Sequence, residues 1–157
     1  METIYATTHG KKMLEVRLEE LVSRREEVAH KIREAREFGD LKENAEYAAA
    51  REEQSNLEDE IASIKEKLPL LKIFSYTKCD TSAVNLGTRV KIQEVGSTRT
   101  LEWIITGVIE NYPEKKYISN ESPLGKELLG KKVGETVEIH KPAGKSKYKI
   151  VNISAGA

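Results

Sequence analysis

The sequence has little cysteine, little histidine and no long apolar run, and each shortage excludes a class of protein. Cys79 is the single cysteine among 157 residues, so an internal disulfide framework is excluded. The three histidines are scattered and, with one cysteine, give no zinc-ligand spacing. No segment approaches the roughly 20 apolar residues of a membrane-spanning helix, and residues 1–12 lack the apolar core of a signal peptide. We therefore expect a cytoplasmic protein with no membrane segment.

An excess of either charge is also missing. The chain holds 26 Lys and Arg against 26 Asp and Glu. Residues 9–74 contain 13 basic and 16 acidic residues, a net −3, whereas residues 75–157 contain 13 and 9, a net +4. Neither part has the strong basic excess of a free-standing nucleic-acid-binding domain, so that class of function is disfavoured.

Two runs of seam residues, spaced by alternating gaps of four and three, occupy residues 8–71. This spacing is typical of the a and d positions of a coiled coil and predicts two long helices. The first begins with Thr8 as N-cap and ends with Gly39 as C′ residue; the second restarts at Asp40 and ends near Pro69. The predicted seam positions are Leu14, Leu18, Leu21, Arg25, Val28, Ile32 and Ala35, then Tyr47, Ala50, Gln54, Leu57, Ile61, Ile64, Leu68 and Leu71.

An antiparallel hairpin accounts for both runs when the chain folds back over residues 38–41. Apolar seam residues then meet in layers, with Leu21 opposite Leu57. Two polar seam residues, Arg25 and Gln54, fall in one layer, which predicts a hydrogen bond between them that fixes the register at some cost in stability. At about 1.5 Å per residue the first helix is roughly 45 Å long, more than a small core needs, so we expect the rod itself to have a function.

The turn of the predicted hairpin carries the candidate functional site. The seam places Glu43 opposite Ala35, where an apolar residue is expected, and Asp40, Glu43 and Tyr47 share one face of the predicted second helix. A local violation of the packing pattern is typical of functional sites. The alternative is a capping box in which Asp40 and Glu43 serve only to begin the helix, and the two roles are compatible.

Two carboxylates at an exposed tip have limited chemistry on their own. Mg²⁺ is usually held by one or two carboxylates together with substrate phosphates and water, so Asp40 and Glu43 form half of a magnesium site. A slender rod with half of a metal site at its end therefore suggests that the tip inserts into the active centre of another protein, which holds the remaining ligands.

Three segments of the chain resemble the bacterial Gre transcript cleavage factors. These are THGKKMLEVRLEEL near the N-terminus, EAREFGDLKENAEYAAAREEQ at the turn and ISNESPLGKELLGKKVGETVEI near the C-terminus. The resemblance implies a factor whose coiled coil enters the secondary channel of RNA polymerase and stimulates cleavage of the 3′ end of backtracked RNA. The factor itself is then not an enzyme, because the polymerase performs the hydrolysis.

The resemblance also implies roles for particular residues. Asp40 and Glu43 are the catalytic carboxylates and hold Mg²⁺ jointly with RNA polymerase. The supporting tip positions are Asn44, Glu46 and Tyr47. Arg33 and Arg36, the basic residues of the first helix nearest the tip, are candidates for phosphate contacts with the nascent RNA. Arg24 is better explained as part of a solvated coiled-coil face, because glutamates are interleaved with it.

The second half of the chain is predicted to be a small α+β domain. Strands are expected around Val90 and Ile92, over 101–105, 136–139 and 148–153, with a short helix that has Ser122 as N-cap. Segment 73–87 is interpreted as a linker plus a first strand. The fold class is thus α+β, with a coiled-coil hairpin over 1–74 and, by resemblance, an FKBP-like domain over 75–157 that docks on the polymerase. We expect a monomer.

Two other functions stay open at this point. A channel-blocking inhibitor of RNA polymerase has the same architecture and no cleavage activity, although the intact Asp40 and Glu43 argue against it. A coiled-coil chaperone or isomerase needs exposed apolar surface at the end of the rod, and Phe38 and Leu41 offer little. Incubation with a stalled, backtracked elongation complex discriminates among the three.

Overall fold

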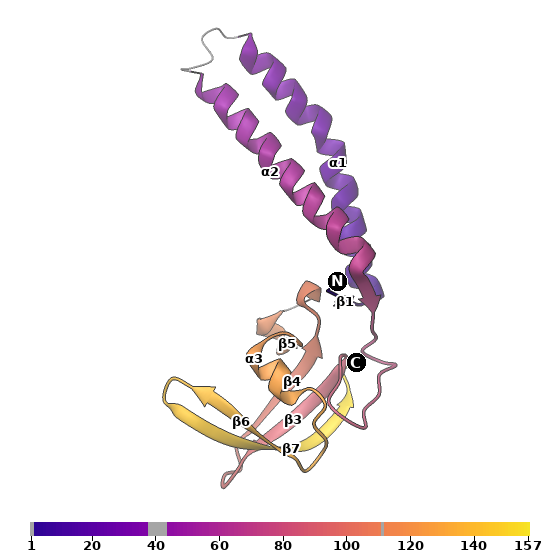
Figure 1. The fold of residues 1–157 in the computed structure, drawn as a ribbon, viewed down its shortest axis with the longest axis vertical. Helices are drawn as coiled ribbons and strands as arrows, with labels where there is room; N and C mark the ends of the chain where they lie inside the picture. The colour runs from indigo at the N-terminus through magenta and orange to yellow at the C-terminus, as the bar shows by residue number, and fades with distance from the viewer. Residues whose placement is uncertain (1, 38–43, 111) are drawn as a thin grey trace. The chain divides into compact units, whose positions relative to one another are not determined.

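The structure is a computed structural model that describes residues 2–37, 44–110 and 112–157. The chain divides into two compact units (Figure 1). One consists of residues 11–70, and the other combines residues 1–10 with residues 71–157. The N-terminal strand and the first residues of the first helix therefore belong with the C-terminal sheet.

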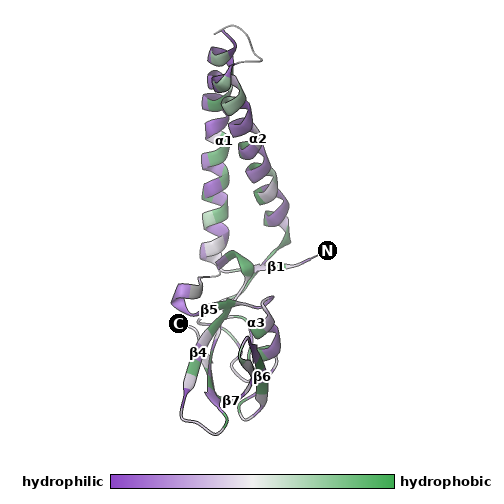
Figure 2. Cartoon of the chain, turned by 90° about the vertical axis from the view of Figure 1, so that its left-hand side faces the viewer, coloured by the Kyte–Doolittle hydropathy of each residue, from purple (hydrophilic) through white to green (hydrophobic). Residues whose placement is uncertain are grey.

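The unit of residues 11–70 is a helical hairpin. Helix α1 spans Thr8–Arg36, helix α2 spans Ala45–Lys67, and a 3-10 turn over Leu68–Leu70 follows it. Apolar residues recur along both helices, as the alternating bands of Figure 2 show. Every apolar position of the predicted seam up to Leu68 is buried or packs against the buried cluster: Leu14, Leu18, Leu21, Val28, Ile32, Ala35, Tyr47, Ala50, Leu57, Ile61, Ile64 and Leu68.

The polar layer of the seam differs from the prediction. Arg25 does not bond to Gln54; it donates from Nε and Nη2 to the two carboxylate oxygens of Glu58, both at 2.8 Å. Gln54 accepts instead from Arg51 on its own helix. Arg25 is exposed, so its long side chain leaves the seam and reaches the neighbouring carboxylate, where the hydrogen bond lowers the pKa of Glu58.

Both predicted helix starts are also corrected. Helix α1 has its cap at Thr7 rather than Thr8, because the Thr7 hydroxyl accepts from the N–H of Gly10 at 3.1 Å. Helix α2 begins at Ala45 rather than Asp40, with Asn44 as N-cap. The predicted end of the second helix near Pro69 is confirmed. The last predicted seam residue, Leu71, opens a strand instead.

The other unit is built on a five-stranded sheet in the order β5-β4-β3-β7-β6, with β4 and β5 parallel and the other neighbours antiparallel. Helix α3, Pro123–Leu128, contributes Leu128 to the apolar core of the sheet, and its cap Ser122 accepts from Gly125 N–H. The strands are β3 Thr88–Glu94, β4 Thr100–Thr106, β5 Tyr117–Ser119, β6 Thr136–Lys141 and β7 Gly144–Ala155.

A separate parallel pair of strands joins the two ends of the hairpin sequence. Strand β1, Ile4–Ala6, pairs with β2, Leu71–Ile73. The first strand predicted within segment 73–87 is wrong, because after Ile73 no strand begins before β3 at Thr88. The four predicted strands and the short helix of the C-terminal half are confirmed, whereas β1, β2 and β5 were not predicted.

Stability of the hairpin depends on its buried seam. Leu57 is 4% exposed, and its truncation leaves a cavity between α1 and α2. We predict that Leu57→Ala lowers the free energy of unfolding of the hairpin by about 2–5 kcal/mol. Urea unfolding followed by helical circular dichroism measures this change. The matched control Ser55→Ala changes an exposed residue of the same helix and is expected to stay within about 0.5 kcal/mol of the parent. Equal effects of both substitutions would contradict the seam.

Candidate functional site at the end of the hairpin

Asn44 joins the ends of the two helices. Its Oδ1 accepts the backbone N–H of Tyr47 at 3.0 Å, which caps α2. Its Nδ2 donates to the carbonyl of Ala35, in the last turn of α1. The first N–H groups and last C=O groups of a helix have no partner within the helix, so one side chain satisfies an unpaired group on each. The hairpin is thereby closed immediately beside residues 38–43.

Tyr47 fills the last apolar layer before the turn. It lies in the first turn of α2 and packs against the buried seam cluster. The guanidinium carbon of Arg36 lies 5.8 Å from the centroid of the Tyr47 ring, within the range of a cation–π contact. A cation–π contact between Arg36 and Tyr47 and the hydrogen bonds of Asn44 thus connect α1 to α2 at the tip end.

Glu46 is exposed in the first turn of α2, where a negative charge complements the helix dipole. It borders a cleft of about 290 Å³ whose floor is formed by small residues. Acidic side chains outnumber basic ones around it. The lining residues are Lys31, Glu34, Ala35, Glu46, Ala49, Ala50 and Glu53.

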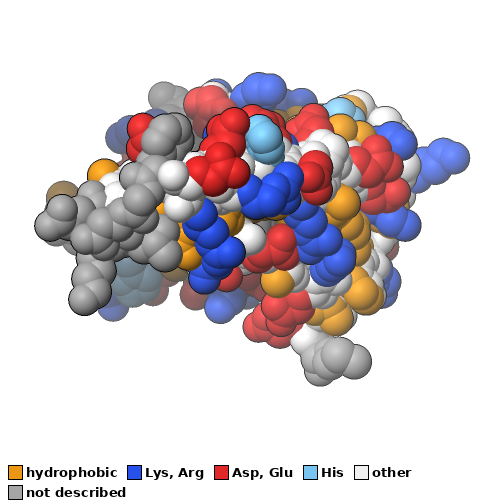
Figure 3. Space-filling model, turned by 90° about the horizontal axis from the view of Figure 1, so that it is seen from above, with side chains coloured by type: hydrophobic (Ala, Val, Ile, Leu, Met, Phe, Trp, Pro, Cys, Tyr) orange, Lys and Arg blue, Asp and Glu red, His pale blue; other side chains and the backbone are white. Residues whose placement is uncertain are grey.

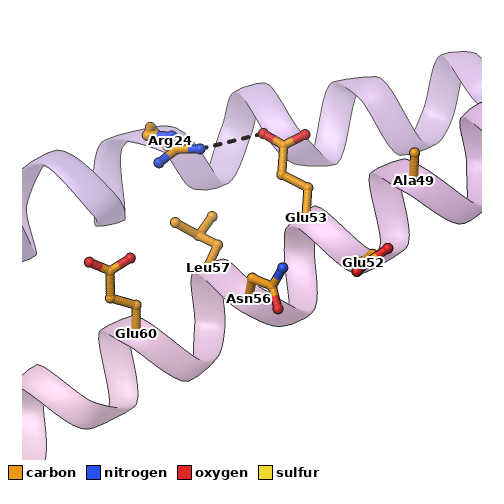
Figure 4. Close-up of a pocket in the computed structure, with 7 residues that line it drawn as sticks. All are labelled: Arg24, Ala49, Glu52, Glu53, Asn56, Leu57 and Glu60. Carbon is orange, nitrogen blue, oxygen red and sulfur yellow. Dashed lines mark hydrogen bonds and ion pairs between the residues drawn. The ribbon is translucent and has the colours of Figure 1, made fainter.

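Basic residues on α1 face acidic residues on α2 along this side of the hairpin. Arg17 pairs with Glu60 at 2.9 Å, Arg24 with Glu53 at 3.4 Å, and Lys31 with Glu53 at 3.3 Å. Figure 4 shows the Arg24–Glu53 pair across a cleft of about 380 Å³ that continues along α2 to Glu60. The charge of Arg24 is therefore paired within the coiled coil, as expected for a solvated face.

The two arginines predicted to contact RNA have different surroundings. Arg33 is 58% exposed and donates to Glu26 at 3.0 Å, an ion pair that solvent screens. Arg36 is exposed and lies over Tyr47. Basic and acidic side chains lie next to one another across the face that Figure 3 presents. Neither arginine is buried, so both can reach a phosphate group at modest cost.

The two predicted catalytic carboxylates lie outside the described residues. Asp40 and Glu43 belong to segment 38–43, as do the predicted C′ residue Gly39 and the predicted opposition of Glu43 to Ala35. The structure brings together Asn44 and Tyr47 with Arg36 directly beside that segment, and leaves Glu46 and Arg33 facing solvent.

Sequence reasoning missed the double role of Asn44. The N-cap signal was present, because Asn is a preferred cap and the predicted seam resumes at Tyr47, three residues later. The competing signal at Asp40 and Glu43 has the same chemistry and was preferred. The bond to Ala35 needs the antiparallel register and cannot be read from local sequence.

No described helix is long and apolar enough to cross a membrane. Among the described residues, no group of three or more His, Cys, Asp or Glu side chains is placed to hold a metal ion.

The closure by Asn44 is testable through its two bonds. We predict that Asn44→Ala lowers the stability of the hairpin by about 1–2 kcal/mol, since it removes the cap and the link to Ala35. Asn44→Asp keeps an acceptor for the N–H of Tyr47 but has no donor for the Ala35 carbonyl. Its stability is therefore expected to lie between that of the parent and that of Asn44→Ala. Thermal unfolding measures both, with Asn56→Ala, an exposed position on α2, as control. A fully stable Asn44→Ala protein would contradict this role.

Comparison with known proteins covers nearly the whole chain. The family model for the N-terminal part of transcription elongation factors matches residues 4–73, and the GreA/GreB C-terminal model matches residues 79–155. Transcription elongation factor GreA of Caldanaerobacter subterraneus subsp. tengcongensis is 42% identical over 151 residues, with 96% of each chain covered. The GreA factor of Alkaliphilus oremlandii is 39% identical over 152 residues, again covering 96% of each.

The chain also aligns with two solved structures over nearly its full length. GreA factor homolog 1 of Thermus thermophilus is 26% identical, covers 97% of this chain and 99% of its own, and has a TM-score of 0.45. A GreA/GreB elongation factor from Nitrosomonas europaea is 15% identical, covers 98% and 99%, and also has a TM-score of 0.45. From the two family models and the curated relatives, this chain belongs to the GreA/GreB family of transcription elongation factors.

Proposed function

We propose that this protein is a transcription elongation factor that binds RNA polymerase and stimulates cleavage of the 3′ end of backtracked RNA. The observation that carries the proposal is the acidic tip sequence of residues 39–47, within the segment that matches the family model. In the chain, residues 38–43 connect α1 to α2, and Asn44, which follows them, bonds to both helices. The protein is then an accessory factor that acts in the cytoplasm, and the polymerase performs the hydrolysis.

Asp40 and Glu43 are the residues that we assign to the chemistry. Carboxylate oxygens are the donors that Mg²⁺ prefers, and two of them fit an ion that keeps its other positions for water and phosphate. In this proposal RNA polymerase supplies the remaining ligands of the ion. When bound, Mg²⁺ supplies charge stabilisation for phosphodiester hydrolysis and lowers the pKa of a coordinated water.

The tip-end residues support this role in separate ways. Asn44 accepts the backbone N–H of Tyr47, which fixes the start of α2 directly after residues 38–43 of the chain. Arg33 and Arg36 contribute positive charge near the tip, which favours approach of the phosphate groups of the nascent RNA. Glu46 adds a negative charge to the first turn of α2.

The sheet unit is assigned to anchoring on RNA polymerase. Its candidate surface is a cleft of about 500 Å³ beside α3 and β6, lined partly by the apolar residues Ile118, Leu124 and Ile139. Leu124 and Ile139 are only partly buried, although they pack against the core of the sheet. Exposed apolar patches mark interaction sites on proteins, and we assign this one to contact with RNA polymerase.

The direct experiment is incubation with a stalled, backtracked elongation complex that carries labelled RNA. The proposal expects release of a 3′ RNA fragment and resumption of elongation when nucleotides are added. Inhibition without release of a fragment would instead support the channel-blocking alternative.

The tip assignment gives a prediction for single substitutions. Asp40→Asn and Glu43→Gln each keep size and polarity but remove a charged metal ligand, so we expect loss of stimulated cleavage with nearly unchanged binding to polymerase. RNA cleavage and competition binding measure the two properties separately. The matched control is Glu52→Gln, an exposed carboxylate on α2. Cleavage by either tip variant at the parent rate would remove the assignment.

Anchoring and chemistry are expected to separate in a titration. Leu124→Ser reduces the apolar lining of the cleft, so the factor concentration for half-maximal cleavage should rise about tenfold with an unchanged maximal rate, equivalent to about 1.4 kcal/mol of binding. The control is Val133→Ser, an apolar residue that is 58% exposed outside the cleft. Circular dichroism checks that both variants fold. Equal shifts for both substitutions would argue against this cleft.

A further inference from the structure

Glu110 is the one charged residue among the described ranges that is buried, with 6% of its surface exposed. It lies at the end of a 3-10 turn, Val108–Glu110, that follows strand β4. Its Oε1 accepts the backbone N–H of Thr7 at 2.6 Å and the hydroxyl of Thr7 at 2.5 Å. Burial of a charged side chain costs free energy unless the side chain is hydrogen-bonded, and these two bonds offset that cost for Glu110.

Thr7 connects Glu110 to helix α1 by hydrogen bonds. Its hydroxyl donates to Glu110 and also accepts the N–H of Gly10, which belongs to the first turn of the helix. Glu110, Thr7 and Gly10 thus form a continuous hydrogen-bonded chain that ends on the helix backbone. A carboxylate at this place also complements the positive end of the helix dipole.

Two glycines allow the segments to approach this closely. A Cβ added to Gly10 would overlap Oε1 of Glu110 and lie 2.9 Å from its Cδ. A Cβ added to Gly107, directly before the 3-10 turn, would overlap the carbonyl oxygen of Tyr5 in strand β1. The close contact between the start of α1 and the 3-10 turn after β4 therefore depends on a glycine in each segment, Gly10 and Gly107.

We propose that Glu110 is a positioning residue for transcript cleavage, because it fixes the first turn of α1 to the sheet unit. All the residues of this lock, Tyr5, Thr7, Gly10, Gly107 and Glu110, lie within the unit of residues 1–10 and 71–157. The helix that starts in the lock is the one that leads to the acidic tip. This inference rests on the proposed cleavage function, since only there does the placement of the tip determine a rate.

The kinetic test compares Glu110→Ala and Gly10→Ala with the parent in a factor titration. Both variants break the lock, the first by removing the acceptor and the second by steric overlap. We expect the maximal cleavage rate to fall at least about tenfold, because displacement of a reacting group by about 1 Å can cost about a hundredfold. The factor concentration for half-maximal cleavage should stay within about twofold, because binding is left intact.

Gly10→Ala separates positioning from stability. Alanine favours a helix over glycine, so on propensity alone this substitution strengthens α1. Glu110→Gln keeps an uncharged acceptor of the same size and is expected to retain an intermediate rate. The control Glu114→Ala changes an exposed glutamate in the next 3-10 turn, Pro113–Lys115, and should leave both parameters unchanged. Circular dichroism confirms that each variant is folded.

A second readout does not depend on cleavage. Cys79 is replaced by serine, and Ser55→Cys and Ser97→Cys provide two exposed attachment sites for spin labels, one in each unit. The labels report the distribution of distances between these two positions. We expect a broader distribution for Glu110→Ala and Gly10→Ala than for the parent or Glu114→Ala. If the parent protein fails to stimulate cleavage, the proposed function fails while this measurement still tests the lock. Unbroadened distributions, or a maximal rate equal to that of the parent, overturn the inference.

Discussion

The apolar seam between α1 and α2 is the constraint on which the hairpin depends. Seven buried residues form one continuous cluster along it, from Leu21 and Ile64 to Ile32 and Ala50. In proteins most of the stability of a helix comes from packing of its apolar face rather than from intrinsic propensity, so each helix of the hairpin depends on the facing one. Ion pairs such as Arg17–Glu60 and Arg25–Glu58 are exposed and add little by comparison.

Hydrogen bonds define where the helices begin and end, which the seam alone cannot do. Asn44 satisfies one group on each helix at the tip end. At the start of α1, inside the sheet unit, the Thr7 hydroxyl accepts the N–H of Gly10, and Glu110 accepts the N–H of Thr7. These bonds are fixed points of the hairpin, because an apolar seam with a heptad repeat tolerates sliding more readily than hydrogen-bonded helix ends do.

Much of the fold could be predicted from the sequence because periodic burial leaves a strong signal. The seam positions from Leu14 to Leu68 and the strands around Ile92, Ile105 and Ile150 follow from that signal. Short strands such as β1 and β5 have three residues each and no period to detect. Arg25 was misassigned because spacing does not reveal that a long charged side chain can leave a seam for Glu58.

Only the surroundings of the candidate site can be compared with the sequence prediction. The acidic motif of residues 39–47 predicts a site between the two helices, but Asp40 and Glu43 lie outside the described residues and stay predictions. The cap at Asn44 was missed because Asp40 gives a similar signal. The burial of Glu110 could not be predicted from the sequence, because its partner Thr7 lies 103 residues away. Contacts over such separations depend on the tertiary fold, and no local pattern encodes them.

We propose that Asp40 and Glu43 complete a magnesium site that RNA polymerase provides in part. A direct test is to measure the Mg²⁺ concentration for half-maximal RNA cleavage by a backtracked elongation complex, with and without the factor. We expect the factor to lower this concentration, because it adds carboxylate ligands to the site. A magnesium dependence that is the same in the presence and absence of the factor would contradict it.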